Sequence, residues 1–64
     1  MARVSIGEER ITIRDEEVET VTEAVRAALR AGEPFVLDLE DAHDGRRCHV
    51  FGTPSTPVVI SAWQ

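Results

Sequence analysis

Alternating apolar and polar residues mark the beginning of the chain. Arg3–Ile6 and Arg10–Arg14 alternate with a period of two, which is typical of β-strands that bury one face. Gly7–Glu9 separates them and has the composition of a tight turn. We therefore predict a β-hairpin with one apolar face. The residues on that face are Val4, Ile6, Ile11 and Ile13.

A helical period follows the hairpin, and the rest of the chain is organised around it. Apolar residues recur at i, i+3 and i+7 from Asp15 to Gly32 and form one stripe. Asp15 is a good N-cap, because its carboxylate can accept a hydrogen bond from a free N–H group of the first turn. Gly32 readily adopts the left-handed conformation that ends many helices, and Pro34 prevents continuation. The predicted stripe consists of Val18, Val21, Val25, Ala28 and Leu29, with Ala24 beside it.

Three further segments return to the period of two. Phe35–Glu40 and Arg46–Phe51 are joined by Asp41–Gly45, which ends in the Asp-Gly turn signal. The loop Gly52–Pro57 contains two prolines and precedes the last strand, Val58–Trp63. The expected fold is a single α+β domain over residues 1–64, in the order ββαβββ. One helix packs on one face of a mostly antiparallel sheet, and a parallel crossover through the helix is one alternative.

Composition narrows the class of protein. A chain of 64 residues forms a small core, which favours pairing with another chain, and its one cysteine allows no internal disulfide. No apolar run approaches the roughly 18–20 residues that span a bilayer, and the first residues lack the apolar segment of a signal peptide. We therefore expect a soluble cytoplasmic protein without a membrane partner.

The face of the sheet away from the helix suggests the function. Alternation places four apolar side chains there: Val36, Phe51, Val59 and Trp63. Such a patch commonly marks an interaction site, and both aromatics are enriched at interfaces. We expect a non-catalytic interaction module that forms a homodimer or docks on a larger protein, as an accessory subunit, an antitoxin-like partner or a phage inhibitor. In the alternative, the aromatics fold over a sheet edge.

Basic residues share this reverse face and suggest a second function. An open sheet with arginines and aromatics can bind single-stranded nucleic acid by stacking its bases. The net charge of −5 opposes that partner, and Asp38 and Glu40 on the same face favour a salt-bridged surface instead. The basic residues are Arg3, Arg10, Arg14, Arg47 and His49.

Catalytic and metal chemistry find little support in the sequence. His43, Cys48 and His49 are close in sequence, but a structural zinc site needs four ligands, and the last two should point to opposite sides of a strand. Cys48 is expected to face the core, where a thiol is inert as a nucleophile. The chain has no glycine-rich phosphate loop and little room for a shaped pocket. We therefore expect no enzyme activity, no metal and no cofactor.

Overall fold

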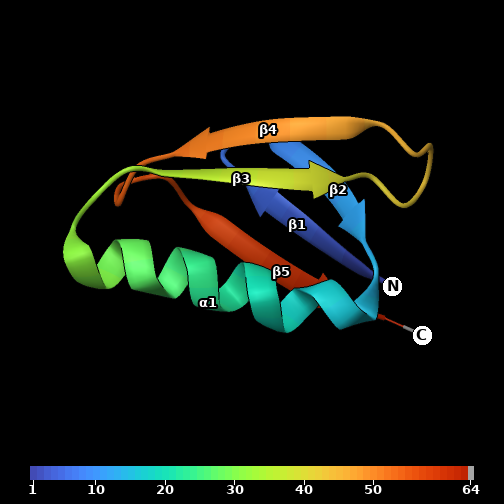
Figure 1. The fold of residues 1–64 in the computed structure, drawn as a ribbon, viewed down its shortest axis with the longest axis horizontal. Coiled ribbons are helices and arrows are strands. Elements are labelled where there is room, and N and C mark those ends of the chain that lie inside the picture. Colours follow the sequence, from blue (N-terminus) through green and yellow to red (C-terminus); the bar gives the residue numbers. More distant parts are fainter. Residues whose placement is uncertain (64) are drawn as a thin grey trace.

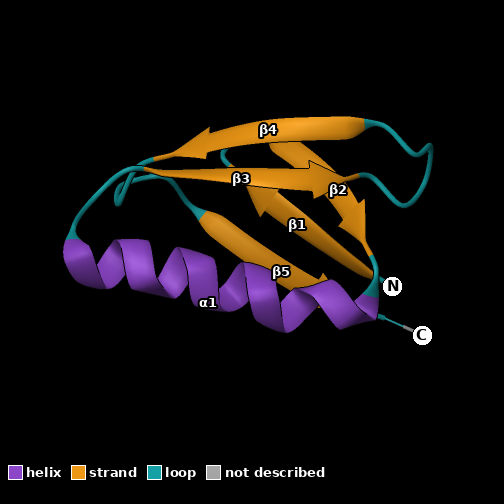
Figure 2. Ribbon diagram, viewed as in Figure 1, coloured by secondary structure: helices purple, strands orange, loops and turns teal. Residues whose placement is uncertain are grey.

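The computed structural model describes residues 1–63, which form one helix and five strands (Figures 1 and 2). The order ββαβββ and the α+β class are confirmed. Figure 1 shows the helix along the lower side of the molecule and the fourth strand along the upper side, and the helix contacts the third and the fifth strands. The elements are β1 (Ala2–Ile6), β2 (Glu9–Ile13), α1 (Asp15–Ala31), β3 (Phe35–Glu40), β4 (Arg47–Gly52) and β5 (Val58–Ala62).

The five described strands form two antiparallel sheets instead of one. The first has the order β2-β1-β5, and the second contains β3 and β4. Val4 of β1 pairs with Ile11 on one side and with Ile60 on the other. Both edges of β1 are therefore occupied, and β3 pairs with β4 alone. The helix leads from one sheet to the other, so the alternative of a parallel β2–β3 crossover is not adopted.

The core lies between the inner faces of the two sheets and is closed on one side by α1. The alternating strands bury the side chains that the period of two predicted. Only Val21 and Val25 of the helix are fully buried, whereas Leu29 is 47% exposed. Val18 and Ala28 are half-buried and pack against this core, so Leu29 is the one residue of the predicted stripe that lies outside it, because α1 lies beside β3 and β5 and does not cover a whole sheet. The buried strand residues are Ala2, Val4, Ile6, Ile11, Ile13, Phe35, Leu37, Leu39 and Val50.

The N-cap of the helix lies one residue earlier than predicted. Arg14 is the N-cap, with an extended backbone, and its N–H donates to the Glu17 carboxylate at 3.4 Å. The prediction that Asp15 is the N-cap is wrong, since Asp15 is the first helical residue and pairs with the Met1 amino group at 2.7 Å. Gly32 ends the helix with φ +69°, as its freedom to adopt positive φ predicts.

The end of β4 depends on a glycine that faces the core. The sequence predicts a loop from Gly52 onward, but Gly52 is the last residue of β4 and pairs with Phe35. The Phe35 ring covers its Cα, so that a Cβ at this position would meet the ring. The strand therefore ends in a glycine, because the Phe35 ring occupies the space that any larger side chain would need.

Candidate interaction surfaces

The four apolar residues predicted to share one open face lie on two surfaces. Val36 and Phe51 are directly opposite each other on β3 and β4, and their side chains are 56% and 72% exposed. Val59 and Trp63 are 57% and 44% exposed, but they lie on or just beyond β5, in the other sheet. All four point away from the core, and the division follows from the separation of the strands into two sheets.

The outward side of the β3–β4 sheet is the first candidate surface, called here the hairpin face. Its apolar end is the Val36–Phe51 pair, and the rest of it carries charged residues. Strand alternation places the two apolar side chains on the same side as the charged ones. Its members are Val36, Asp38, Glu40, Arg47, His49 and Phe51.

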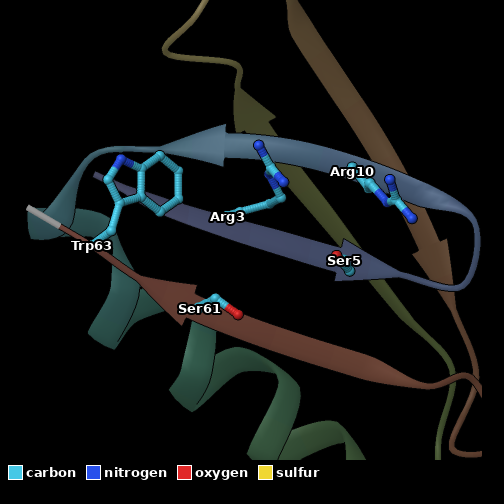
Figure 3. Close-up of a pocket in the computed structure, with 5 residues that line it drawn as sticks. All are labelled: Arg3, Ser5, Arg10, Ser61 and Trp63. Carbon is cyan, nitrogen blue, oxygen red and sulfur yellow. The ribbon is translucent and has the colours of Figure 1, made fainter.

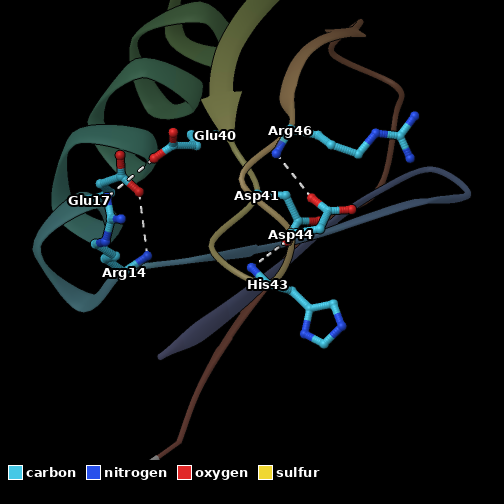
Figure 4. Close-up of polar contacts among 7 residues, drawn as sticks. All are labelled: Arg14, Glu17, Glu40, Asp41, His43, Asp44 and Arg46. Atoms are coloured by element: carbon cyan, nitrogen blue, oxygen red, sulfur yellow. Dashed lines mark hydrogen bonds and ion pairs between the residues drawn. The ribbon is translucent and has the colours of Figure 1, made fainter.

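Ion pairs occupy the charged part of the hairpin face. The Arg47 guanidinium lies 2.8 Å from the Asp38 carboxylate, and this hydrogen bond is the main cause that holds the pKa of Asp38 below its ordinary value of 3.8. His49 lies 4.0 Å from the same carboxylate, and Arg14 lies 3.4 Å from Glu40 (Figure 4). Three of the residues proposed for nucleic-acid binding therefore have carboxylate partners, and such exposed pairs contribute little stability.

The outer edge of β4 is free. Within residues 1–63, β4 pairs only with β3. The Asp41 N–H donates to the Arg46 carbonyl at 2.7 Å, which makes this pair hydrogen-bonded. Hydrogen-bonded and non-hydrogen-bonded pairs alternate along an antiparallel ladder. The backbone N–H and C=O groups of Arg47, His49 and Phe51 are therefore directed away from β3, towards solvent.

The outward side of the three-stranded sheet carries the second candidate surface, the arginine pocket (Figure 3). This is a shallow hollow of about 520 Å³. The Arg3 guanidinium carbon lies 5.7 Å from the centre of the Trp63 ring, within the range of a cation–π contact. Alternation along each strand predicts the outward side for its arginines, its tryptophan and its two serines, but it does not predict that these strands lie together and form one pocket. The pocket is lined by Arg3, Ser5, Arg10, Ser61 and Trp63.

No acidic side chain lines the arginine pocket, although the chain has twelve aspartates and glutamates. Among residues 1–63, no carboxylate lies within 4.0 Å of the charged nitrogens of Arg3 or Arg10. These two arginines therefore differ from Arg14 and Arg47, whose charges are paired.

The third candidate surface is a second hollow, of about 330 Å³, between α1 and β5. The exposed Leu29 and the half-buried Val58 and Ile60 form most of its apolar wall. This groove explains where Leu29 lies: it flanks β5 and does not enter the core. No helix in the described part of the chain is long and apolar enough to cross a membrane.

The structure does not bring the possible metal ligands together. His43 lies in the turn after β3, where its backbone N–H donates to the Asp41 carboxylate at 2.8 Å (Figure 4). His49 lies on the hairpin face, and the half-buried Cys48 points to the other side of β4. Within residues 1–63, no three His, Cys, Asp or Glu side chains are grouped so that they could hold a metal ion.

No protein-family model matches the chain, and comparisons with curated proteins and with solved structures found no similar protein. A proposal for its function therefore depends on these three surfaces.

Proposed function

We propose that this protein is a non-catalytic interaction module that forms a homodimer through β4. The observation that carries the proposal is the free edge of β4, with the exposed Phe51 side chain beside it. An unpaired strand edge is a template for pairing with another chain, and natural proteins usually protect it with charged side chains, proline or a covering element. β4 contains no lysine or proline, its Arg47 charge is paired with Asp38, and among the described elements β4 packs mainly on β3.

The backbone groups at the edge of β4 suggest one register for the pairing. A two-fold axis at His49 would place it opposite the partner's His49, and Arg47 opposite the partner's Phe51. These are the residues whose backbone groups point outward, so every outward N–H and C=O group would find a partner. The two small sheets would then join into one antiparallel sheet, which is more stable than an isolated hairpin.

The side chains of the hairpin face also favour a second copy as the partner. In this register the Phe51 ring lies beside the partner's Arg47, which suits contact between a guanidinium and an aromatic face. The face carries both signs of charge, on Asp38 and Glu40 and on Arg47, so that two copies meet without a large like-charge repulsion. The exposed side of α1 is strongly acidic and would repel its copy.

The other unpaired edges among the described strands, those of β2, β3 and β5, support such pairing less well. The helix contacts β3 and β5, and β2 lies next to β3, so neighbouring elements restrict the approach of another chain there. A β4 interface is nevertheless small compared with the roughly 1,600 Å² of a typical stable complex. We therefore expect a weak dimer, whose population depends on protein concentration.

Sedimentation velocity over a wide range of protein concentration tests the proposal. The native chain should shift from monomer to dimer, and Phe51→Lys should remain monomeric because it places a charge at the edge. Val59→Lys is the matched control: Val59 is similarly exposed but lies in the other sheet, so this variant should dimerise normally. Circular dichroism should show that both variants are folded.

A backbone substitution tests the edge more directly. His49→Pro removes an N–H group that points away from β3, so it costs no hydrogen bond within the monomer but interrupts the dimer. A native chain that is monomeric at every concentration would overturn the proposal. So would a Phe51→Lys variant that dimerises like the native chain, or a monomer that instead captures a different protein through Phe51.

A further inference from the structure

We propose that the arginine pocket binds the phosphate of a nucleotide, with the base beside Trp63. The nucleotide is either free or part of a single-stranded nucleic acid, since both present the same chemistry. This inference is independent of dimerisation, because the pocket lies on β1, β2 and β5 and leaves β4 unoccupied. Both surfaces can therefore be occupied at once.

Two guanidinium groups and two hydroxyls converge on the pocket from adjacent strands. Arg10 is directly opposite Ser5, and Arg3 is directly opposite Ser61, so the polar groups form two neighbouring rows across the sheet (Figure 3). The guanidinium fork matches the oxygens of phosphate, and serine hydroxyls add donors. A carboxylate has two oxygens and satisfies one fork, whereas a phosphate group has enough oxygens for both.

The arginines are available to a ligand. No carboxylate within residues 1–63 lies within 4.0 Å of either guanidinium, so a phosphate would not have to displace an internal partner. The contact with Trp63 restrains Arg3 before a ligand arrives, which lowers the entropy lost on binding. Arg14, Arg26 and Arg47, by contrast, have carboxylate partners.

The size and the aromatic wall of the pocket favour a nucleotide over inorganic phosphate. The hollow of about 520 Å³ is far larger than a phosphate group and falls within the usual range for small-molecule sites. The Trp63 side chain is partly exposed, so a base would stack on the part of the indole that Arg3 leaves uncovered. The net charge of −5 opposes anion binding at long range, so we expect modest affinity that depends on these local contacts.

Intrinsic fluorescence provides a direct assay, because Trp63 is the only tryptophan in the chain. Adenosine 5′-monophosphate should change the Trp63 emission saturably, and adenosine should bind at least about tenfold more weakly because it lacks the charged phosphate. Arg10→Gln should weaken binding by a similar factor. Arg26→Gln is the matched control, since Arg26 lies on the helix and pairs with Glu23, and it should bind like the native chain.

A short single-stranded oligonucleotide distinguishes the two sources of the nucleotide. Tighter binding of the oligonucleotide than of the mononucleotide, with a strong decrease at higher salt, indicates a nucleic acid. Equal or weaker binding indicates a free nucleotide. The absence of any saturable change with both probes would overturn the proposal, as would equal binding of adenosine or an unaffected, folded Arg10→Gln variant. Phe51→Lys should still bind, which separates this test from that of the dimer.

Discussion

Replacing Gly52 with alanine tests the packing that closes the β3–β4 end of the core. An added Cβ would lie 2.7 Å from Cε2 and 2.9 Å from Cε1 of Phe35, and it would also meet Cζ. Ordinary van der Waals contacts are 3.4–4 Å long, so the ring has to move by roughly 1 Å. Gly52 does not have positive φ, so alanine introduces no left-handed backbone strain, and the effect comes from the ring contact.

The cost follows from the position of the ring. Phe35 is only 7% exposed and packs in the core, so its ring cannot turn freely into solvent. Overpacking of this kind typically costs about 1–3 kcal/mol. In a domain of this size each kcal/mol lowers the melting temperature by roughly 4–8 °C, so we expect Gly52→Ala to melt roughly 8–16 °C lower for a loss of about 2 kcal/mol.

Thermal unfolding followed by circular dichroism measures this loss, and a double-mutant cycle identifies its cause. Phe35→Leu removes the ring atoms that the new Cβ would meet, at the cost of some buried apolar area. The double variant should therefore lose clearly less stability than the sum of the single variants. A melting temperature of Gly52→Ala close to that of the native chain would refute the reasoning, and so would strictly additive losses.

Other substitutions test the helix and the hairpin face. Gly32→Ala should cost about 1 kcal/mol in urea unfolding because φ is +69°, although nothing lies within 4 Å of the added Cβ; an unchanged midpoint would contradict this. Leu29→Gln should change stability by less than about 0.5 kcal/mol, whereas Val25→Ala should cost about 2 kcal/mol, and equal effects would contradict the packing of α1. NMR titration should give a pKa of Asp38 below 3.8 that rises in Arg47→Gln. The stabilisation from this pair is present above the ordinary pKa and is lost as pH falls through the lowered value; an unchanged pKa in the variant would contradict the contact.

The local structure followed closely from the sequence. The period of two located all five described strands to within one residue at each end, and the Gly32 terminus of the helix was predicted correctly. Alternation also placed Phe51 and Trp63 outside the core. These features depend on short-range properties, because the side on which a strand residue lies is decided by its neighbours along the chain.

The candidate sites were predictable only in part. Alternation selected Arg10 and Trp63, but it also grouped them with Arg47 and Phe51, which lie on the other sheet. The sequence gives the direction of a side chain relative to its own strand and does not specify which strands become neighbours. The contact of Asp15 was also beyond the sequence: Asp15 is the first helical residue, and its carboxylate pairs with the Met1 amino group, which only the fold brings near.

The sequence by itself determined the elements, their buried sides and an excess of acidic charge. The tertiary structure alone decided that β5 pairs with the free edge of β1 and that β3 pairs with β4 in a separate sheet. This choice divides the outward residues between two surfaces and leaves β4 with an open edge. The physical reason is that strand pairing depends on contacts between residues far apart in the chain, whose free energies depend on the whole packed core and not on local pattern.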